Sequence, residues 1–166
     1  MANSTSMCTS FMSELMLGQH QFGTSTIVSR TSLTSPTADT FKAALYFASA
    51  TVNAATTVYS TTGEVTNSSG TGYTAGGVTV TNGTGPLSTN SSATVGTAYW
   101  TPTASFSWTA LTVTTAFDAV LIYNSTQSNK AVSVHNFGSQ TITAGTFTLT
   151  MPSNTTSTAL LRLATA

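Results

Sequence analysis

The stretch TFKAALYF, residues 40–47, marks the point at which the sequence takes on a period of two. The odd-numbered positions from Phe41 to Phe47 would point to one side of an extended chain, and the even-numbered positions from Lys42 to Tyr46 would point to the other. Because successive side chains of a β-strand point to opposite faces of the sheet, this alternation predicts a strand over the segment.

Further strand-like segments follow this one to the end of the chain, separated by turn-rich stretches such as NGTGPLSTNSS (82–92). Short strands about 8–12 residues apart, with turn signals between them, are typical of sandwiches and barrels. DAVLIY (118–123) is almost wholly apolar and should be a central strand with both faces covered. No helix of crossover length intervenes, so we predict an all-β fold, an antiparallel β-sandwich or jelly-roll-like arrangement. The later segments are TTVYS, GGVTVTN, ATVGTAYW, SFSWTALTVT, DAVLIYN, KAVSVHNF, TFTLTM and ALLRLA.

The segment TSFMSELMLGQHQF, residues 9–22, carries the only helical signal in the sequence. Thr9 or Ser10 could cap the start of this helix, and Gly18 could end it. Residues 23–39 are mostly polar, and we interpret them as a loop or arm that could include a short strand at 26–30.

These patterns divide the chain into two parts. Residues 1–39 are predicted to form an N-terminal helix or arm with a linker, and residues 40–166 are predicted to form the β-sandwich domain. Removal of residues 1–23 is therefore expected to leave a folded domain.

Charge is unusually sparse in this chain. Of the 166 residues 5% are charged, and four basic and four acidic residues sum to zero, whereas an ordinary soluble domain has about 25% charged residues. Nucleic acid binding needs several Lys or Arg on one face, and an anionic membrane surface attracts basic clusters, so neither is expected as a partner. The longest apolar runs are shorter than the roughly 20 residues of a membrane-spanning helix. A neutral surface rich in Thr and Ser favours packing beside neighbours in an assembly.

The N-terminal residues carry neither the basic start nor the apolar segment of a secretory signal, so synthesis in the cytoplasm is expected. Cys8 is the single cysteine, which excludes a disulfide within the chain and leaves one between chains open.

Residues 72–77, GYTAGG, form a glycine-rich stretch that could cradle a phosphate or make a turn. A phosphate loop opens a helix and ends with a Lys, but here Gly77 is followed by the strand-like VTVT. We therefore interpret Gly72, Gly76 and Gly77 as turn residues, with Gly76 or Gly77 at positive φ. Tyr73 would pack over this turn or against a neighbouring subunit.

The residues that could carry chemistry are few and scattered. His20 and His135 are the two histidines, but the sequence has no G-x-S-x-G motif that would mark a catalytic serine for them to activate. The single Cys, the two His and the four acids are not spaced as the ligands of a metal site are. Glu64 and Asp118 could meet as a glycosidase pair, although nothing in the sequence singles them out. We expect no catalytic residue, no metal and no cofactor.

Aromatic residues gather around Pro102, and Trp100 and Trp108 are the largest of them. Three interpretations are open for these side chains: a core cluster, a subunit interface, where Trp is enriched, or a platform that stacks on carbohydrate.

The order of the pieces TFKAALY, GYTAGG, LIYN and NKAV resembles a family of small virion structural proteins of tailed bacteriophages, the capsid decoration or cement proteins. The resemblance runs from about residue 7 to residue 164. It implies an all-β protein, without catalytic residues, that clamps neighbouring major capsid protein subunits on the outer surface of the virion. It also implies a homo-oligomer, a dimer or a trimer.

Candidate residues for contacts with capsid subunits or with other copies follow from this resemblance and from the apolar side chains of the first segment. They are Phe11, Met12, Leu15, Phe22, Tyr73 and Trp100. Two other functions remain open at this point: a phage tail or host-surface module that binds glycans through an exposed Trp or Tyr, and a glycan-active enzyme.

Overall fold

The structure is a computed structural model that describes residues 3–16, 18–20, 22, 38–66, 70–83, 85–89 and 96–164. The linker predicted at 23–39, including the short strand predicted at 26–30, lies almost wholly outside the described residues.

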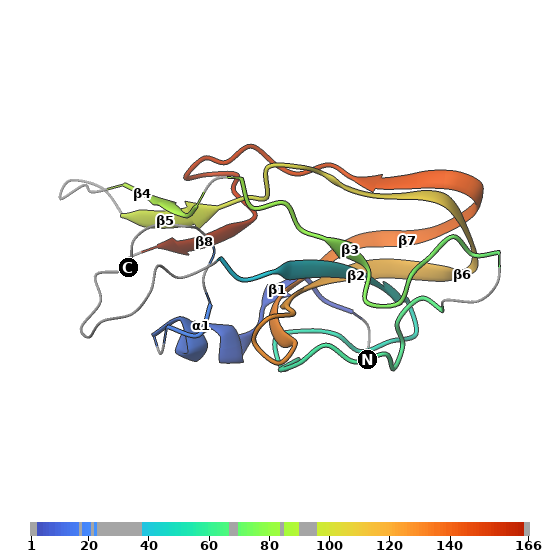
Figure 1. Ribbon diagram of the computed structural model, residues 1–166, viewed down its shortest axis with the longest axis horizontal. Helices are drawn as coiled ribbons and strands as arrows, with labels where there is room; N and C mark the ends of the chain where they lie inside the picture. Colours follow the sequence, from blue (N-terminus) through green and yellow to red (C-terminus); the bar gives the residue numbers. More distant parts are fainter. Residues whose placement is uncertain are drawn as a thin grey trace.

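Two antiparallel sheets make up the described fold (Figure 1). The larger sheet has the strand order β1-β7-β6-β2-β3, and the smaller one has the order β4-β5-β8. One short helix, α1 (Thr9–Met16), lies beside the smaller sheet. The all-β prediction is therefore confirmed, together with the short N-terminal helix. The strands are β1 (Ser6–Met7), β2 (Phe41–Phe47), β3 (Val78–Thr79), β4 (Leu87–Ser88), β5 (Thr97–Trp100), β6 (Phe106–Asn124), β7 (Lys130–Leu149) and β8 (Leu161–Ala164).

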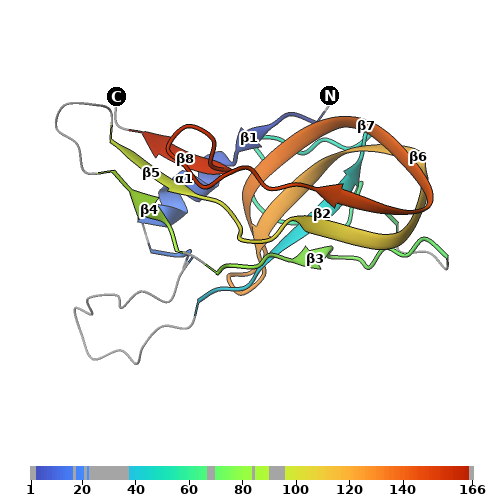
Figure 2. The same cartoon turned by 90° about the horizontal axis from the view of Figure 1, so that it is seen from above.

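The hairpin formed by β6 and β7 dominates the molecule, and it turns back on itself (Figures 1 and 2). Its register slips at several points between Trp108 and Ala119, where β-bulges bend and twist the strands. The rings of Phe117 and Phe147 lie 5.0 Å apart, although Phe147 pairs with Trp108 in the hairpin. The two halves of one hairpin therefore face each other and enclose part of the core.

β2 is the strand predicted from TFKAALYF, and it lies inside the larger sheet between β6 and β3. Leu45 pairs with Val120 of β6, and Ala43 pairs with Val78 of β3. From Ala43 to Tyr46 every residue is buried, so both faces of the strand are covered.

β6 runs between β7 and β2 in its second half, where the sequence reads DAVLIYN. Residues Ala119 to Asn124 are all buried, and this confirms the prediction of a central strand covered on both faces.

The first described residues belong to the same core as the strands. β1 pairs with β7 through Ser6 and Val134, and Cys8, Phe11 and Phe22 are buried in the common hydrophobic cluster. The division into residues 1–39 and 40–166 stays a prediction. The described part of the first segment nevertheless packs into the sandwich, so the expectation that the rest folds without it loses its physical basis.

Candidate functional site

An apolar pocket opens between α1 and the inner face of the smaller sheet. Phe11 and Leu15 line it from the helix, and Trp100 of β5 and Leu161 of β8 line it from the sheet. Trp100 and Leu161 are direct cross-strand partners, which places both side chains on the same face. The pocket has a volume of about 110 Å³, enough for roughly one apolar side chain.

Phe22 joins the two walls of this pocket. Its ring stacks on Phe41 of β2 at 4.4 Å and meets the indole of Trp100 edge-on at 4.7 Å. Phe11 adds a further edge-on contact to Phe22 at 5.8 Å. This aromatic cluster makes the pocket floor rigid, because each ring is held by at least one other.

The mouth of the pocket carries exposed apolar surface. Leu163 lines the pocket and is 40% exposed, and Leu87 of the neighbouring β4 is 44% exposed. Ala98 and Leu163 are cross-strand partners that continue the apolar face beyond Trp100. Large apolar side chains that remain exposed beside an apolar pocket are typical of an interaction surface.

The predicted interface residues meet in part at this pocket. Phe11, Leu15, Phe22 and Trp100 all line it, although they come from segments far apart in the sequence. Phe11, Phe22 and Trp100 are at most 6% exposed, so they form the floor of the pocket, and their place in an interface stays a prediction. Met12 lies in α1, but its side chain falls outside the described part of the structure.

Sequence reasoning missed the residues of the pocket rim. Ala98, Leu161 and Leu163 belong to two short strands that are distant in sequence, and the pairing of β5 with β8 brings them together. The alternation in ALLRLA was the one local signal, because it places Leu161 and Leu163 on the same face of a strand.

The GYTAGG stretch is a turn, and Tyr73 within it is buried in the chain's own core. The Tyr73 hydroxyl donates to Glu64 Oε1 at 2.7 Å, and the Gly76 N–H donates to the same oxygen at 2.7 Å. Tyr59 donates to the other carboxylate oxygen at 2.6 Å. Tyr73 is 2% exposed, so of its two predicted placements the structure shows the one over the turn, in the chain's own core.

The three glycines of this stretch all adopt positive φ, as the turn interpretation requires. A Cβ at Gly77 would lie 1.8 Å from the carbonyl oxygen of Ala43 in β2, so the turn approaches the strand as closely as the backbone allows. Burial raises the pKa of Tyr73, and a hydrogen bond to Glu64 raises that pKa further. Glu64 therefore serves as the anchor of a turn, with both oxygens engaged.

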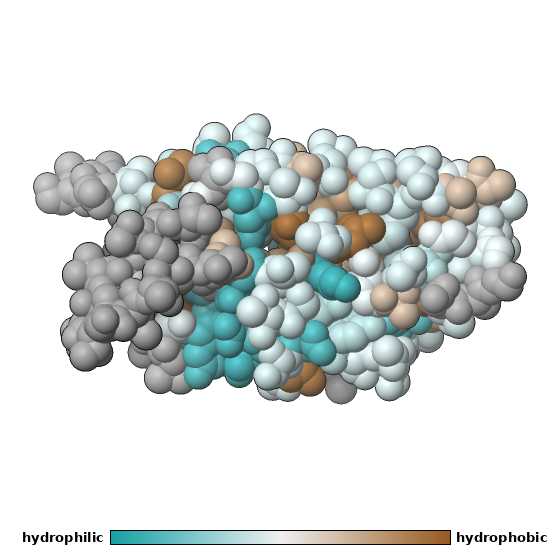
Figure 3. All heavy atoms as spheres, viewed as in Figure 1, coloured by the Kyte–Doolittle hydropathy of each residue, from teal (hydrophilic) through white to brown (hydrophobic). Residues whose placement is uncertain are grey.

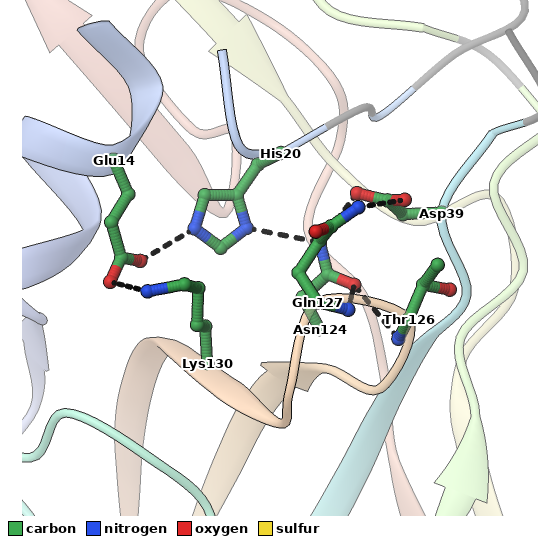
Figure 4. A network of polar contacts seen from close by, with 7 residues as sticks. All are labelled: Glu14, His20, Asp39, Asn124, Thr126, Gln127 and Lys130. Carbon is green, nitrogen blue, oxygen red and sulfur yellow. Dashed lines mark hydrogen bonds and ion pairs between the residues drawn. The ribbon is translucent and has the colours of Figure 1, made fainter. Parts of the chain in front are cut away.

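A chain of polar side chains, most of them buried, links α1 to the β6–β7 turn (Figure 4). His20 Nε2 lies 2.7 Å from Glu14 Oε2, and Lys130 donates to the other Glu14 oxygen at 2.7 Å. On its opposite side His20 Nδ1 lies 3.1 Å from the amide nitrogen of Asn124, which also donates to Asp39 Oδ2 at 2.6 Å.

This hydrogen-bond pattern indicates which ring nitrogen of His20 donates and which accepts. The Asn124 amide nitrogen can only donate, so His20 Nδ1 accepts. His20 Nε2 then carries a hydrogen and donates a hydrogen bond to Glu14. Burial alone would raise the pKa of Glu14, but the hydrogen bonds from Lys130 and His20 outweigh it and hold that pKa below its ordinary value. Both ring nitrogens of His20 are thus occupied by partners that fix its orientation, and the network ties the N-terminal segment to the sheet.

His135 makes a different contact. Its Nε2 lies 3.0 Å from Ser133 Oγ, two residues away on β7. Burial lowers the pKa of His135 to about 4, so its neutral ring is a weak base near pH 7. Asp118 is hydrogen-bonded to Asn3 and Asn136 instead, and among the described contacts no carboxylate reaches His135.

In the part of the chain that the structure describes, no three residues of the types His, Cys, Asp and Glu come together in a group that could hold a metal ion. None of the helices described is both long and apolar enough to cross a membrane. Cys8 is fully buried, and burial raises its pKa to about 12, so a disulfide between chains would require this segment to open.

The chain was compared with protein-family models, with curated proteins and with solved structures, and no match was found in any of the three comparisons.

Proposed function

We propose that this protein is a structural virion protein that decorates and stabilises a phage capsid by binding across major capsid protein subunits. The observation that carries the proposal is the apolar pocket between α1 and the smaller sheet. It collects Phe11, Leu15, Phe22 and Trp100, residues already selected as interface candidates, and it has exposed Leu163 at its mouth. The family resemblance of the motif order supports the same role.

The pocket would act as a socket for one apolar side chain of a capsid subunit. Burial of a side chain the size of Val, Leu or Phe contributes about 1.5–3 kcal/mol. A single contact of this size is weak, and the rigid aromatic floor limits the entropy lost on binding. Copies that contact one another or several capsid subunits at once would bind the shell far more tightly than a single contact allows.

The surface fits a lattice contact that does not depend on charge. Figure 3 shows a face on which most of the described surface has intermediate hydropathy, as expected for exposed Thr and Ser. The net charge of the chain is zero, so neither attraction nor repulsion at long range controls how copies approach the shell. Binding driven by the pocket would therefore change little with salt concentration.

The pocket is tested by placing a charge at its mouth. Leu163→Asp would bring an unpaired carboxylate into the contact, and Val58→Asp is the matched control, because Val58 is 49% exposed and does not line the pocket. Each variant is added to capsids of a phage that lacks the protein, and the number of copies per shell is measured. We expect occupancy to fall at least about tenfold for Leu163→Asp, equivalent to about 1.4 kcal/mol.

Two results would contradict the pocket as the capsid contact. Full occupancy by Leu163→Asp is one, and an equal loss for Val58→Asp is the other. A virion reconstruction provides a separate check on the location, because density for this fold in the tail would favour host-surface recognition over capsid decoration.

Glycan recognition through an exposed Trp has less support. Trp100 and Trp108 are 2% and 4% exposed, so neither indole offers a stacking platform in this conformation. For a glycan-active enzyme, Glu64 was the residue of interest. Its two carboxylate oxygens already accept hydrogen bonds from Tyr59, Tyr73 and Gly76.

A further inference from the structure

A polar cleft opens between the outer strands of the two sheets, on the far side of Met7 and Leu161 from the apolar pocket (Figure 2). β1 is the last strand on one side of the larger sheet, and β8 is the last strand on one side of the smaller sheet. The cleft has a volume of about 440 Å³. Sites for small molecules usually occupy about 300–1,000 Å³ and combine apolar walls with a few polar groups, so the cleft has room for a small ligand.

The walls of the cleft carry hydroxyl groups and one positive charge. Among the lining residues that the structure describes, Arg162 is the one that is charged near pH 7, because burial lowers the pKa of His135 to about 4 and no Asp or Glu lines the cleft. A hydroxyl group can both donate and accept a hydrogen bond, so such walls suit a ligand that carries hydroxyl groups itself. The residues that contribute hydroxyl groups are Thr5, Ser6, Thr97, Ser133 and Thr156.

Arg162 is oriented by its own chain and has no acidic partner among the described residues. Its Nη1 donates to the carbonyl of Ser157 at 2.7 Å and lies 3.5 Å from the carbonyl of Thr156. The ion pairs of the described residues both involve Glu14, and neither includes Arg162. The described bonds leave Nε and Nη2 of Arg162, and two parallel N–H groups of a guanidinium bind a carboxylate at both oxygens. Arg162 therefore keeps donors for one carboxylate.

Ser133 and His135 contribute one more donor to the same cleft. They lie two residues apart on β7, and Ser133 Oγ is 3.0 Å from His135 Nε2. If the hydroxyl donates, Nδ1 of the neutral ring carries the ring hydrogen, and if Nε2 donates, the hydroxyl hydrogen is left over. In either arrangement the pair keeps one hydrogen for which the described residues supply no acceptor.

We propose that this cleft binds a small carboxylate that also carries hydroxyl groups, the class of the sugar acids. Arg162 pairs with the carboxylate, while the Ser133–His135 pair and the threonines of the walls bond to the hydroxyl groups. Met7 and Leu161 contact the carbon skeleton. A second acidic group on the ligand would meet no second cation among the described lining residues, so a monocarboxylate fits better than a dicarboxylate.

This site goes beyond the proposed capsid contact and does not depend on it. Arg162 is exposed, so water screens its charge, and we expect a weak dissociation constant on the order of 1 mM.

The cleft is tested on the full chain with three probes. Glucuronate is the sugar acid, glucose is its neutral counterpart with a CH₂OH group in place of the carboxylate, and hexanoate is a carboxylate without hydroxyl groups. NMR shifts of the backbone amides of Ser133, His135 and Arg162 are followed as each probe is added. Arg162→Gln removes the cation of the cleft. Lys42→Gln is the matched control, because it removes one positive charge from β2, outside the cleft.

We expect glucuronate to bind at least about fivefold more tightly than glucose or hexanoate, since each of these lacks one of the two recognised groups. Arg162→Gln should bind glucuronate no better than glucose, and Lys42→Gln should behave as the wild type. Absence of a saturable shift with glucuronate, or equal binding of glucuronate and either other probe by the wild type, would overturn the proposal. An equal loss in Lys42→Gln would also overturn it. No capsid takes part in this measurement, so its failure would leave the capsid proposal intact, and full occupancy by Leu163→Asp would leave the cleft intact.

Discussion

Gly77 determines how closely the turn after Tyr73 can approach β2. Its φ is +72°, a conformation that costs roughly 1–2 kcal/mol for residues with a Cβ, and the carbonyl of Ala43 occupies the position that a Cβ would take. The turn is held there by Glu64, which accepts the Gly76 N–H. Two separate constraints, conformation and contact, therefore act on one residue.

Gly77→Ala and Gly138→Ala separate these constraints. Gly138 also has positive φ, +82°, but nothing lies within 4 Å of a Cβ built on it. We expect Gly138→Ala to cost about 1–2 kcal/mol, and Gly77→Ala to cost about 1–3 kcal/mol more because β2 would have to move. Urea denaturation of both variants measures the difference, and similar costs for the two would contradict the close approach.

The sequence was sufficient to identify the turn but not its anchor. Glycine pairs before a strand predict positive φ from local geometry, and the structure confirms this at Gly76 and Gly77. Glu64 precedes the turn by several residues and binds it through Tyr73 and a backbone N–H. Such a contact depends on how the loops pack together, and no local pattern in the sequence encodes it.

The strands β6 and β7 are each longer than the sequence predicts. SFSWTALTVT and DAVLIYN were predicted as separate strands, but they form one strand, and KAVSVHNF and TFTLTM likewise merge into β7. The gap between the predicted strands of β6 falls at the register shifts between Val113 and Ala119, and the gap in β7 contains the positive φ of Gly138 and Ala144. A bulge interrupts the period without ending the strand, so periodicity alone divided each strand in two.

The N-terminal segment behaves as part of the sandwich. Phe11 is 2% exposed and contacts both His20 and Phe22, and the polar network around Glu14 holds the same segment from the other side. The sequence suggested a detachable arm because the segment is helical, short and followed by a polar stretch. That local reasoning could not include the contacts with β7 and β2, such as Cys8 with Val132 and Phe22 with Phe41, that hold the segment.

Phe11→Ala tests this assignment. Truncation of a buried Phe costs about 3–5 kcal/mol, so we expect a large fall in the free energy of unfolding. Leu15→Ala is the control, since Leu15 lies on the same helix but is only partly buried, and its cost should be clearly smaller. Thermal and urea denaturation measure both, and a chain lacking residues 1–22 should be unfolded or strongly destabilised. A truncated chain with the stability of the full one would restore the arm interpretation.

At the scale of the whole molecule, few groups titrate, which makes the dependence of stability on pH simple to predict. The chain has four acidic residues and two histidines. Burial lowers the pKa of His135 from 6.5 to about 4. Between these two pH values His135 is protonated in the unfolded state and neutral in the folded state. Stability should therefore fall as pH falls from about 6.5 to 4, and the lowered pKa of Glu14 extends the loss at lower pH.

At alkaline pH the stability depends on buried groups whose pKa values are raised. Burial raises the pKa of Tyr123 to about 12 and that of Cys8 to about 12, and it also raises the pKa of Tyr46, Tyr59 and Tyr73. Above the ordinary values of 9.0 for Cys and 10.0 for Tyr, the unfolded state loses protons that the folded state keeps. Stability should then fall as pH rises, which leaves a plateau between about pH 6.5 and 9.

His135→Gln should flatten the acid side of this profile and leave the alkaline side unchanged. A shift of this size corresponds to roughly 3 kcal/mol of stability between pH 6.5 and 4, and the variant should lose that dependence. Free energies of unfolding from urea titrations at each pH measure it. If the variant kept the full acid-induced loss, burial of His135 would not be its source.

The pairing of β1 with β7 has a consequence for the order of folding during synthesis. β6 and β7 can close progressively from the turn at residues 125–129, because their partners are near one another along the chain. β1 leaves the ribosome before the other strands, yet its partners Ser133 and Val134 follow only after β2 to β6 have been made. The segment that contains β1 must therefore wait for β7, so closing of the core around Cys8 and Phe11 would be a late step of folding.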